Sequence, residues 1–332
     1  MSLKFQLLPT RVYFEDLLLE INHAKKHICI QSLYFDPGHY LDKIITALIK
    51  KQKEGLFVEL IIDAFGKSPQ IKTHRFESAL AKLIDNHVAV TFINPLPSRQ
   101  NWIFPYLHRN HIKIVLIDNT IYFGGINFSN QELTFQDLMI KVVDEKISTI
   151  FEQIINESKQ QILEDSSIRL DNKNILMVEG INTQSIIYQR ALSLINDAKK
   201  SIVFTSQFSP DGKMLDSLYQ STSRGVKLTI IVPVRNHFNR LFELLNQWNN
   251  LMIIIKQKNL PLLKIKSMIH AKLLLIDNQT LLIGSHNLCW LGVASKSYEI
   301  MLQSTDSNLI NQVKQFTNHL ITDNQGDSCC NH

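Results

Sequence analysis

An internal repeat limits the folds open to this chain more than any other feature of its sequence. Residues 21–28 read INHAKKHI, and residues 195–202 read INDAKKSI. Similar segments follow both copies in the same order. A chain that contains the same pattern twice is expected to fold as two similar halves.

Each half has the order strand, helix, strand. The helical patterns carry apolar residues at helical spacing, and Gly55 or Gly225 follows each as a C-cap. The segments are residues 29–35, 41–53 and 57–62 in the first half and residues 203–208, 214–223 and 226–232 in the second. This order predicts an α/β fold of two similar halves with mostly parallel sheets. The polar stretch at residues 165–173 predicts the boundary, so the halves are residues 1–165 and 166–332.

A His-x-Lys motif stands at the same place in both halves. The first copy reads HIKIVLID from His111, and the second reads HAKLLLID from His270. Residues two apart on a strand project from the same face, so Lys113 is expected beside His111 and Lys272 beside His270. The flanking aliphatic residues are typical of central strands that are buried on both faces.

The residues after each motif supply further candidates. Asp118 and Asp277 lie seven residues after the histidines, on the opposite face of a regular strand, and an asparagine follows each. They are therefore predicted to support a turn or a hydrogen bond. Small residues that allow close approach of the backbone come next: Gly124, Gly125, Gly284 and Ser285.

Amides and carboxylates complete the two constellations. Asn127 and Asn287 follow the small residues and could each donate to a phosphate oxygen. Asp137 and Glu299 supply one carboxylate per half. A carboxylate that accepts the Nδ1 proton of a histidine leaves Nε2 free as base or nucleophile.

The two motifs resemble the signature HxKx4Dx6G[GS]xN of the phospholipase D superfamily. The second copy matches it at every position, whereas the first has five residues, 119–123, where the pattern has six. Four further segments are similar to those of cardiolipin synthases: QSLYFD at 31–36, DAFG at 63–66, FINPL at 92–96 and RNH at 109–111. Residues 292–298 lack the Arg-Ser and Asn usual there, and the chain looks like a short form without N-terminal membrane helices.

The resemblance implies a mechanism. Two motifs meet across a pseudo-twofold axis, one histidine attacks phosphorus to form a phosphohistidine, and the other protonates the departing alkoxide. By resemblance, His111 is the nucleophile and His270 the acid. The residues implied around the non-bridging oxygens are Lys113, Lys272, Asn127 and Asn287. No metal or cofactor is expected, and the implied substrate is a phospholipid similar to phosphatidylglycerol.

Composition gives only limited information about where in the cell the protein works. The formal net charge is +5 and the pI is near 8.9, which suits an anionic membrane surface. No apolar run reaches the ~18 residues of a membrane span, and residues 1–16 do not read as a signal peptide. The four cysteines show neither metal nor disulfide spacing. These features predict a cytoplasmic protein that associates peripherally with a membrane.

Alternatives remain open at this point. Phospholipase D hydrolysis would use the same residues as transfer. A nuclease of the superfamily would need a strongly basic groove, so nucleic acid is the less favoured partner, and intact motifs argue against an inactive scaffold. Residues 102–107 (WIFPYL) are either an apolar lip for acyl chains or ordinary packing. Lys256, Lys258, Lys264 and Lys266 are a basic rim or a solvated edge, and Cys329–Cys330 is a frayed end or a lipid attachment site.

Overall fold

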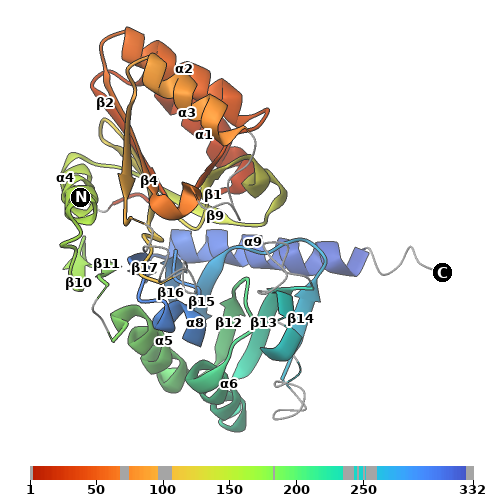
Figure 1. The fold of residues 1–332 in the computed structure, drawn as a ribbon. Helices are drawn as coiled ribbons and strands as arrows, with labels where there is room; N and C mark the ends of the chain where they lie inside the picture. The colour runs from red at the N-terminus through yellow and green to blue at the C-terminus, as the bar shows by residue number, and fades with distance from the viewer. Residues whose placement is uncertain are drawn as a thin grey trace.

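The computed structural model describes residues 3–67, 75–95, 107–181, 184–234, 243–244, 247–249, 251 and 260–326. Two β-sheets lie in its centre, one from each half, and helices cover their outer sides (Figure 1). The predicted α/β fold with two similar halves is therefore confirmed.

The first sheet has seven strands in the order β1-β9-β7-β6-β2-β4-β5. Their bounds are β1 (Gln6–Pro9), β2 (His27–Ser32), β4 (Phe57–Asp63), β5 (Ala89–Ile93), β6 (Lys113–Ile117), β7 (Thr120–Gly124) and β9 (Leu138–Val143). A separate two-stranded sheet pairs β3 (Phe35–Asp36) with β8 (Phe128–Ser129). The described helices of this half are α1 (Thr10–His23), α2 (Leu41–Lys53), α3 (Phe76–Asp85) and α4 (Glu145–Gln160), with the 3₁₀ helices η1 (Ala64–Lys67) and η3 (Asn130–Thr134).

The second sheet has eight strands in the order β10-β11-β17-β16-β15-β12-β13-β14. Their bounds are β10 (Ser166–Arg169), β11 (Asn174–Glu179), β12 (Ser201–Thr205), β13 (Lys227–Pro233), β14 (Leu262–Ile265), β15 (Lys272–Ile276), β16 (Thr280–Gly284) and β17 (Glu299–Ser304). The described helices are α5 (Ile186–Asp197), α6 (Gly212–Ser223), α8 (Trp290–Ala294) and α9 (Ser307–Gly326).

The predicted parallel pairing is confirmed where the βαβ units lie. Strands β2, β4 and β5 pair in parallel, as do β12, β13 and β14. The strands on the other side of β2 and β12 pair antiparallel, so by pairing each sheet is mixed rather than mostly parallel. The reason is local, because the turn after each His-x-Lys strand is too short for a crossover and instead forms a hairpin.

These hairpins also show where the first motif is one residue shorter than the superfamily pattern. The same pairing joins Lys113 to Gly124 in one half and Lys272 to Gly284 in the other. Two residues connect β6 to β7, whereas three residues connect β15 to β16. The shorter turn therefore absorbs the difference, and the residues after the glycines keep their place.

Three apolar cores hold the layers together. One lies between the two sheets and includes residues of both, such as Phe123 and Leu275, together with residues of α4 and α9. The other two lie on the outer sides, under α1, α2 and α3 in the first half and under α5 and α6 in the second. Strands β6 and β15 are buried along their whole length, as predicted for central strands. The motif lysines are thus carried by buried strands, and the motif histidines lie directly before them.

Helix α2 shows why the repeated pattern forms a helix. Leu41, Ile44, Ile45 and Leu48 lie on one buried face, as their spacing predicts. Gly55 follows with φ +92°, a left-handed conformation that L side chains rarely adopt, and Gly225 has φ +81° in the second half. No helix in the described part of the chain is both long and apolar enough to span a bilayer.

The two motif aspartates support turns rather than the site. Each begins the hairpin turn with positive φ, +50° at Asp118 and +54° at Asp277. The carboxylate of Asp118 accepts from the backbone N–H groups of three successive residues, 25–27, at 2.8–3.1 Å. Asp277 does the same with residues 199–201. Each aspartate therefore anchors the backbone at the start of a strand, β2 in the first half and β12 in the second.

Candidate active site

The two halves join through short β-bridges that flank the histidines. Asn110 pairs with Tyr298, and Gln136 pairs with Ile269, in both cases in parallel. The backbone N–H of His111 donates to the Tyr298 carbonyl at 3.0 Å, and that of His270 donates to the Gln136 carbonyl at 2.9 Å. The histidine segments therefore pair with the opposite half, and strands β6 and β15 begin only at the lysines, two residues later than the strand pattern predicts.

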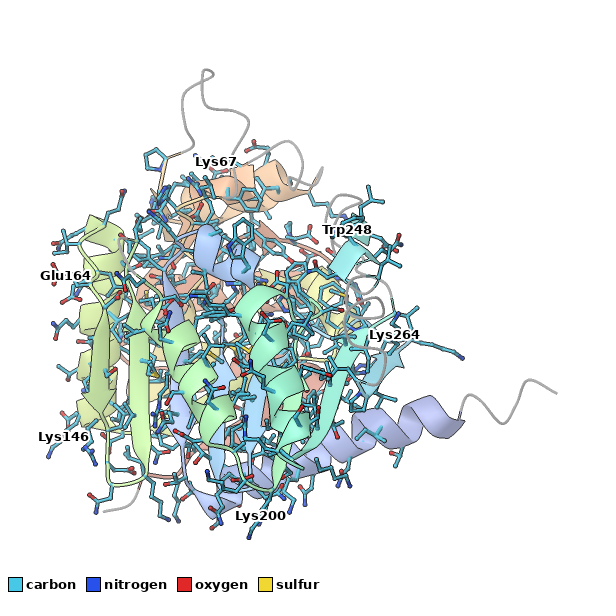
Figure 2. The ribbon with its side chains drawn as sticks, turned by 90° about the horizontal axis from the view of Figure 1, so that it is seen from below. Lys67, Lys146, Glu164, Lys200, Trp248 and Lys264 are labelled. Atoms are coloured by element: carbon cyan, nitrogen blue, oxygen red, sulfur yellow. The ribbon has the colours of Figure 1, made fainter. Side chains whose placement is uncertain are left out.

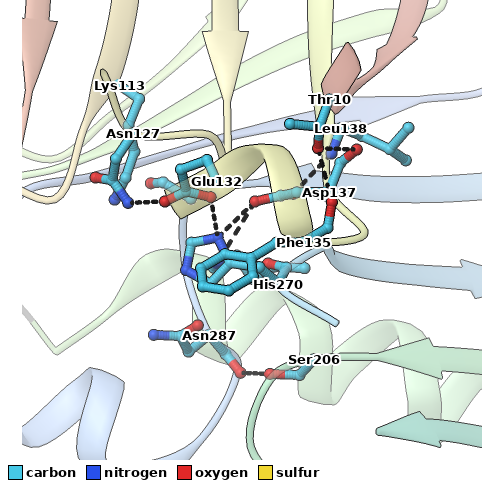
Figure 3. A network of polar contacts seen from close by, with 12 residues as sticks. Thr10, Lys113, Asn127, Glu132, Phe135, Asp137, Leu138, Ser206, His270 and Asn287 are labelled. Carbon is cyan, nitrogen blue, oxygen red and sulfur yellow. Dashed lines mark hydrogen bonds and ion pairs between the residues drawn. The ribbon is translucent and has the colours of Figure 1, made fainter. Parts of the chain in front are cut away.

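This pairing exchanges the carboxylates between the halves. Glu299 of the second half lies 2.9 Å from Nδ1 of His111 in the first. Asp137 of the first half lies 2.6 Å from Nδ1 of His270 in the second (Figure 3). A carboxylate at Nδ1 holds the proton on that nitrogen, so Nε2 of each ring is free to act as base or nucleophile.

The environments of the two histidines differ. The side chain of His111 is 15% exposed, whereas that of His270 is 2% exposed. Burial, followed by Lys113 and Lys272, holds the pKa of His111 well below its ordinary value. Burial and Lys272 also lower the pKa of His270, and Glu132 and Asp137 oppose that shift. The surroundings of His111 thus favour the neutral ring over the imidazolium.

Both motif lysines are fully buried close to the histidines. The Nζ of Lys113 donates to the carbonyl of His111 at 2.7 Å, and Lys272 makes the equivalent contact with His270. Burial lowers the pKa of Lys113 to about 7, with Lys272 contributing in the same direction, and burial also lowers the pKa of Lys272. An anion bound between these two lysines would stabilise their charged forms.

Asn127 and Asn287 lie at the site, and both are buried. Nδ2 of Asn127 donates to Glu132 at 2.7 Å, which leaves its second amide hydrogen for another acceptor. The backbone carbonyl of Asn287 accepts from Ser206 at 2.9 Å (Figure 3). Glu132 is a site residue that the motif pattern does not include. The sequence shows Glu132 only as a carboxylate shortly after the first motif. Comparing the two repeats does not single it out, because Gly292 stands at the equivalent position of the second half.

The small residues fit the carboxylates. A Cβ on Gly125 would lie 2.4 Å from a carboxylate oxygen of Asp137, so a larger residue would displace that acid. A Cβ on Gly284 would lie 2.2 Å from the Ile300 carbonyl. In the second half Ser285 takes the place of Gly125, and its hydroxyl donates to Glu299. Gly125 and Ser285 thus set the position of the acid that each histidine meets.

A buried ion pair fixes the segment that leads into His111. Asp63 accepts from Arg109 at 3.0 Å, from the backbone N–H of Asn110 at 2.7 Å and from Asn94 at 2.9 Å. These residues come from three segments that the sequence singles out separately. Their convergence on one carboxylate holds the backbone next to His111.

Asp63→Asn is expected to destabilise the fold by about 3–5 kcal/mol, because the buried Arg109 charge would lose its partner. The free energy of unfolding in urea measures this loss. Glu54→Gln, which removes an exposed carboxylate beside Lys51, is the control and should remain close to wild type. An Asp63→Asn protein as stable as this control would show that the network contributes nothing.

A second buried cluster lies behind Glu299. Glu179 is directly opposite Glu299 in the β11–β17 pairing. It accepts from Ser185 at 2.8 Å, and Ser185 also lies 3.4 Å from Nε2 of His286. Burial raises the pKa of Glu179 to about 8 and lowers that of His286 to about 4. His286 is therefore held among fixed partners, whereas its motif position alone suggests a side chain that lines the pocket without a set role.

Glu179→Gln is expected to change how stability depends on pH. Glu179 stays protonated in the folded state up to about pH 8, whereas it ionises near pH 4.5 when unfolded. The wild type should therefore lose up to about 1.4 kcal/mol per pH unit across this window relative to the variant. Urea unfolding at pH 5 and pH 8 measures this, with the exposed Glu164→Gln as control (Figure 2). A Glu179→Gln difference that is equal at both pH values would refute the shift.

Among the described residues, Glu132, Asp137 and His270 form the one group whose ligand atoms lie close enough, within 4.8 Å of one another, to hold a metal ion. The contacts of His270 with the two acids account for the same atoms without a metal. Lys264 and Lys266 are exposed (Figure 2 labels Lys264), whereas Lys256 and Lys258 lie outside the described residues. Residues 102–106 of the WIFPYL segment and the Cys329–Cys330 end also lie outside them.

Comparison with known proteins gives a consistent result. The family model described as cardiolipin synthase, PLD-like domain, matches residues 17–159 and 191–321, one segment in each half. Cardiolipin synthase A of Buchnera aphidicola subsp. Acyrthosiphon pisum is 24% identical over 361 residues, which cover 98% of this chain and 70% of that protein. The major cardiolipin synthase of Bacillus subtilis is 26% identical over 302 residues, which cover 83% of this chain and 60% of that protein.

Solved structures show the same fold. Phosphatidylserine synthase of Haemophilus influenzae Rd KW20 aligns with a TM-score of 0.72 and 16% identity over 95% of this chain and 85% of that one. Polyphosphate kinase of Porphyromonas gingivalis aligns with a TM-score of 0.60 and 11% identity over 94% of this chain and 46% of that one. At these identities the likeness concerns the fold alone.

Proposed function

We propose, since the chain belongs to the phospholipase-D-like domain family of cardiolipin synthase, that it is a phosphatidyltransferase acting on phospholipids. The finer proposal is that it joins two phosphatidylglycerol molecules into cardiolipin and releases glycerol. The observation that carries the transfer chemistry, whichever lipid is used, is the exchange of carboxylates: Glu299 holds His111, and Asp137 holds His270, each across the interface between the halves. Because each Nδ1 is engaged by a carboxylate, the Nε2 atoms of both histidines are available to react with one phosphodiester.

In the first step, Nε2 of His111 attacks phosphorus and forms an N–P bond. The P–O bond to the departing glycerol breaks, and His270 donates its Nε2 proton to that oxygen. Lys113 and Lys272 stabilise the charge on the non-bridging oxygens, with Asn127 and Asn287 as further donors. The buried ammonium groups support this role because an anion between them would offset their desolvation.

In the second step, a hydroxyl of the acceptor lipid gives its proton to His270 and attacks phosphorus. The N–P bond breaks, His111 is restored, and His270 is again protonated. Water in place of the acceptor would give phosphatidic acid by the same sequence of bond changes. The identity of the acceptor therefore decides between transfer and hydrolysis.

The setting follows from the substrate. A phospholipid is presented at a bilayer surface, and the net charge of +5 favours an anionic one. We therefore propose that the protein works while bound peripherally to such a surface.

Product analysis tests the proposal. The purified protein is incubated with vesicles of phosphatidylglycerol, and separately with single-stranded DNA. Cardiolipin and glycerol in equal amounts are the expected products. Phosphatidic acid alone would replace the transferase by a phospholipase D, cleaved DNA would replace it by a nuclease, and unchanged lipid would contradict both lipid activities.

A further inference from the structure

Glu132 is a buried acid beside His270 that the two-motif pattern does not include. It lies on η3, is fully buried, and approaches the site from the first half. One oxygen, Oε1, accepts from Asn127 at 2.7 Å and lies 3.4 Å from the Tyr34 hydroxyl. The other, Oε2, lies 3.5 Å from Nδ1 of His270 (Figure 3). Glu132 therefore connects Asn127, a candidate donor to the substrate phosphate, with His270.

Among the described residues of the second half, no acid occupies the equivalent position. Glu132 is the fifth residue after Asn127 and the third residue of η3. The fifth residue after Asn287 is Gly292, the third residue of α8. A Cβ on Gly292 would already lie 3.3 Å from Cε1 of His286, so the packing there leaves little room for a longer side chain.

The two histidines consequently meet different numbers of carboxylates. Within 4.0 Å of Nδ1, His270 has Asp137 and Glu132, whereas Glu299 is the acid found beside His111 among the described residues. Negative charge at this distance in a buried site favours the imidazolium over the neutral ring. A general acid has to be protonated when the substrate binds, and a nucleophile has to be neutral.

We propose that Glu132 is a positioning residue that supplies His270 with a second carboxylate and thereby fixes it as the proton donor to the leaving alkoxide. This inference rests on the proposed function and deepens it, because it gives a structural reason for the division of roles between the histidines. Glu132 does not touch the reacting atoms in this scheme. It acts through His270, and it holds Asn127 at the same time.

The remaining charges around His270 act in both directions. Lys272, on the strand that follows it, opposes protonation, and Lys113 lies close enough to Glu132 and Asp137 to be affected by both. Burial alone would raise the pKa of Asp137, but Lys272 and His270 together lower it below its ordinary value. Burial raises the pKa of Glu299, by contrast, although Lys113 and His286 oppose the shift. The surroundings of Asp137, beside His270, thus favour the ionised carboxylate more than those of Glu299, beside His111.

Glu132→Gln tests the inference, because glutamine keeps the size and the acceptor for Asn127 but removes the charge. Two substrates separate a proton donor from a structural support: phosphatidylglycerol, whose leaving alkoxide needs a proton, and bis(p-nitrophenyl) phosphate, whose leaving group does not. We expect turnover of the lipid to fall about 10-fold, turnover of the aryl ester to change less than about twofold, and KM to stay nearly constant. The alkaline limb of the lipid pH profile should move about one pH unit lower.

The outcomes distinguish the inference from the proposed function. Wild-type protein that leaves phosphatidylglycerol unchanged contradicts the function and the inference together. Active wild type with a Glu132→Gln variant equally slow on both substrates, or with an unmoved alkaline limb, contradicts the inference alone. Glu20→Gln, which removes a carboxylate from the Lys141 pair outside the site, is the matched control and should behave as wild type with both substrates.

Folding of the variant is checked by its unfolding temperature. If Glu132→Gln does not fold, Glu132→Asp and Glu132→Asn give the same comparison at equal size. The aspartate variant should keep the wild-type alkaline limb, and the asparagine variant should show the lower one. Coincident limbs in these two variants would overturn the inference.

Discussion

His111→Ala and His270→Ala are each expected to lower turnover of phosphatidylglycerol by about 10⁴-fold or more, without unfolding the protein. Each variant lacks one of the two groups that the reaction needs at the same phosphorus, so neither half can work alone. For the same reason the double variant should be no slower than either single variant. Product formation and the unfolding temperature are measured for all three proteins, with the exposed His23→Ala as control.

Two independent sites would give a different pattern. Each single variant would then keep about half of the wild-type turnover, and only the double variant would be inactive. That result would contradict a shared site even if both histidines were needed for full activity.

Asp137→Asn is expected to lower kcat by about 10³-fold, with KM nearly unchanged. The amide carries no charge and can present its NH2 group to Nδ1 as a donor. It therefore neither stabilises the His270 imidazolium nor fixes the proton on Nδ1. Because Asp137 belongs to the first half and His270 to the second, the effect crosses the interface. Steady-state kinetics on folded variants measures it.

Asp118→Asn provides the matched control for this prediction. It is the same chemical change in the same half, at an aspartate that belongs to the motif but binds backbone N–H groups at residues 25–27. Its kcat should stay near wild type, while the protein loses some stability. If a folded Asp118→Asn variant lost as much kcat as Asp137→Asn, the separation between motif support and site would be wrong.

Much of this fold could be predicted because it depends on local patterns. Periodicity placed α2, and the odd offset of Asp118 from His111 predicted that this carboxylate points away from the site. The hairpins are not predicted, although Asp118-Asn119 reads as a turn, because the βαβ pattern predicts parallel neighbours. A two-residue turn admits only an antiparallel partner, so this information was present in the sequence.

The site could be predicted only in part because its geometry depends on how the halves dock. The repeat predicts one carboxylate per half. The crossing of Asp137 to His270 and of Glu299 to His111 follows instead from bridges between distant segments. The position of Glu132 follows from the same docking. A repeat pattern detects what the two halves share, and Glu132 is a feature in which they differ.

The most direct test of the shared site counts covalent intermediates. The protein is mixed with short-chain phosphatidylglycerol, quenched within the first turnover and analysed by intact mass and peptide mapping. We expect one phosphatidyl group per chain, attached to His111, and none on the His111→Ala variant. Two groups per chain, or one attached to a residue outside the two motifs, would contradict the claim that both histidines serve a single phosphorus atom.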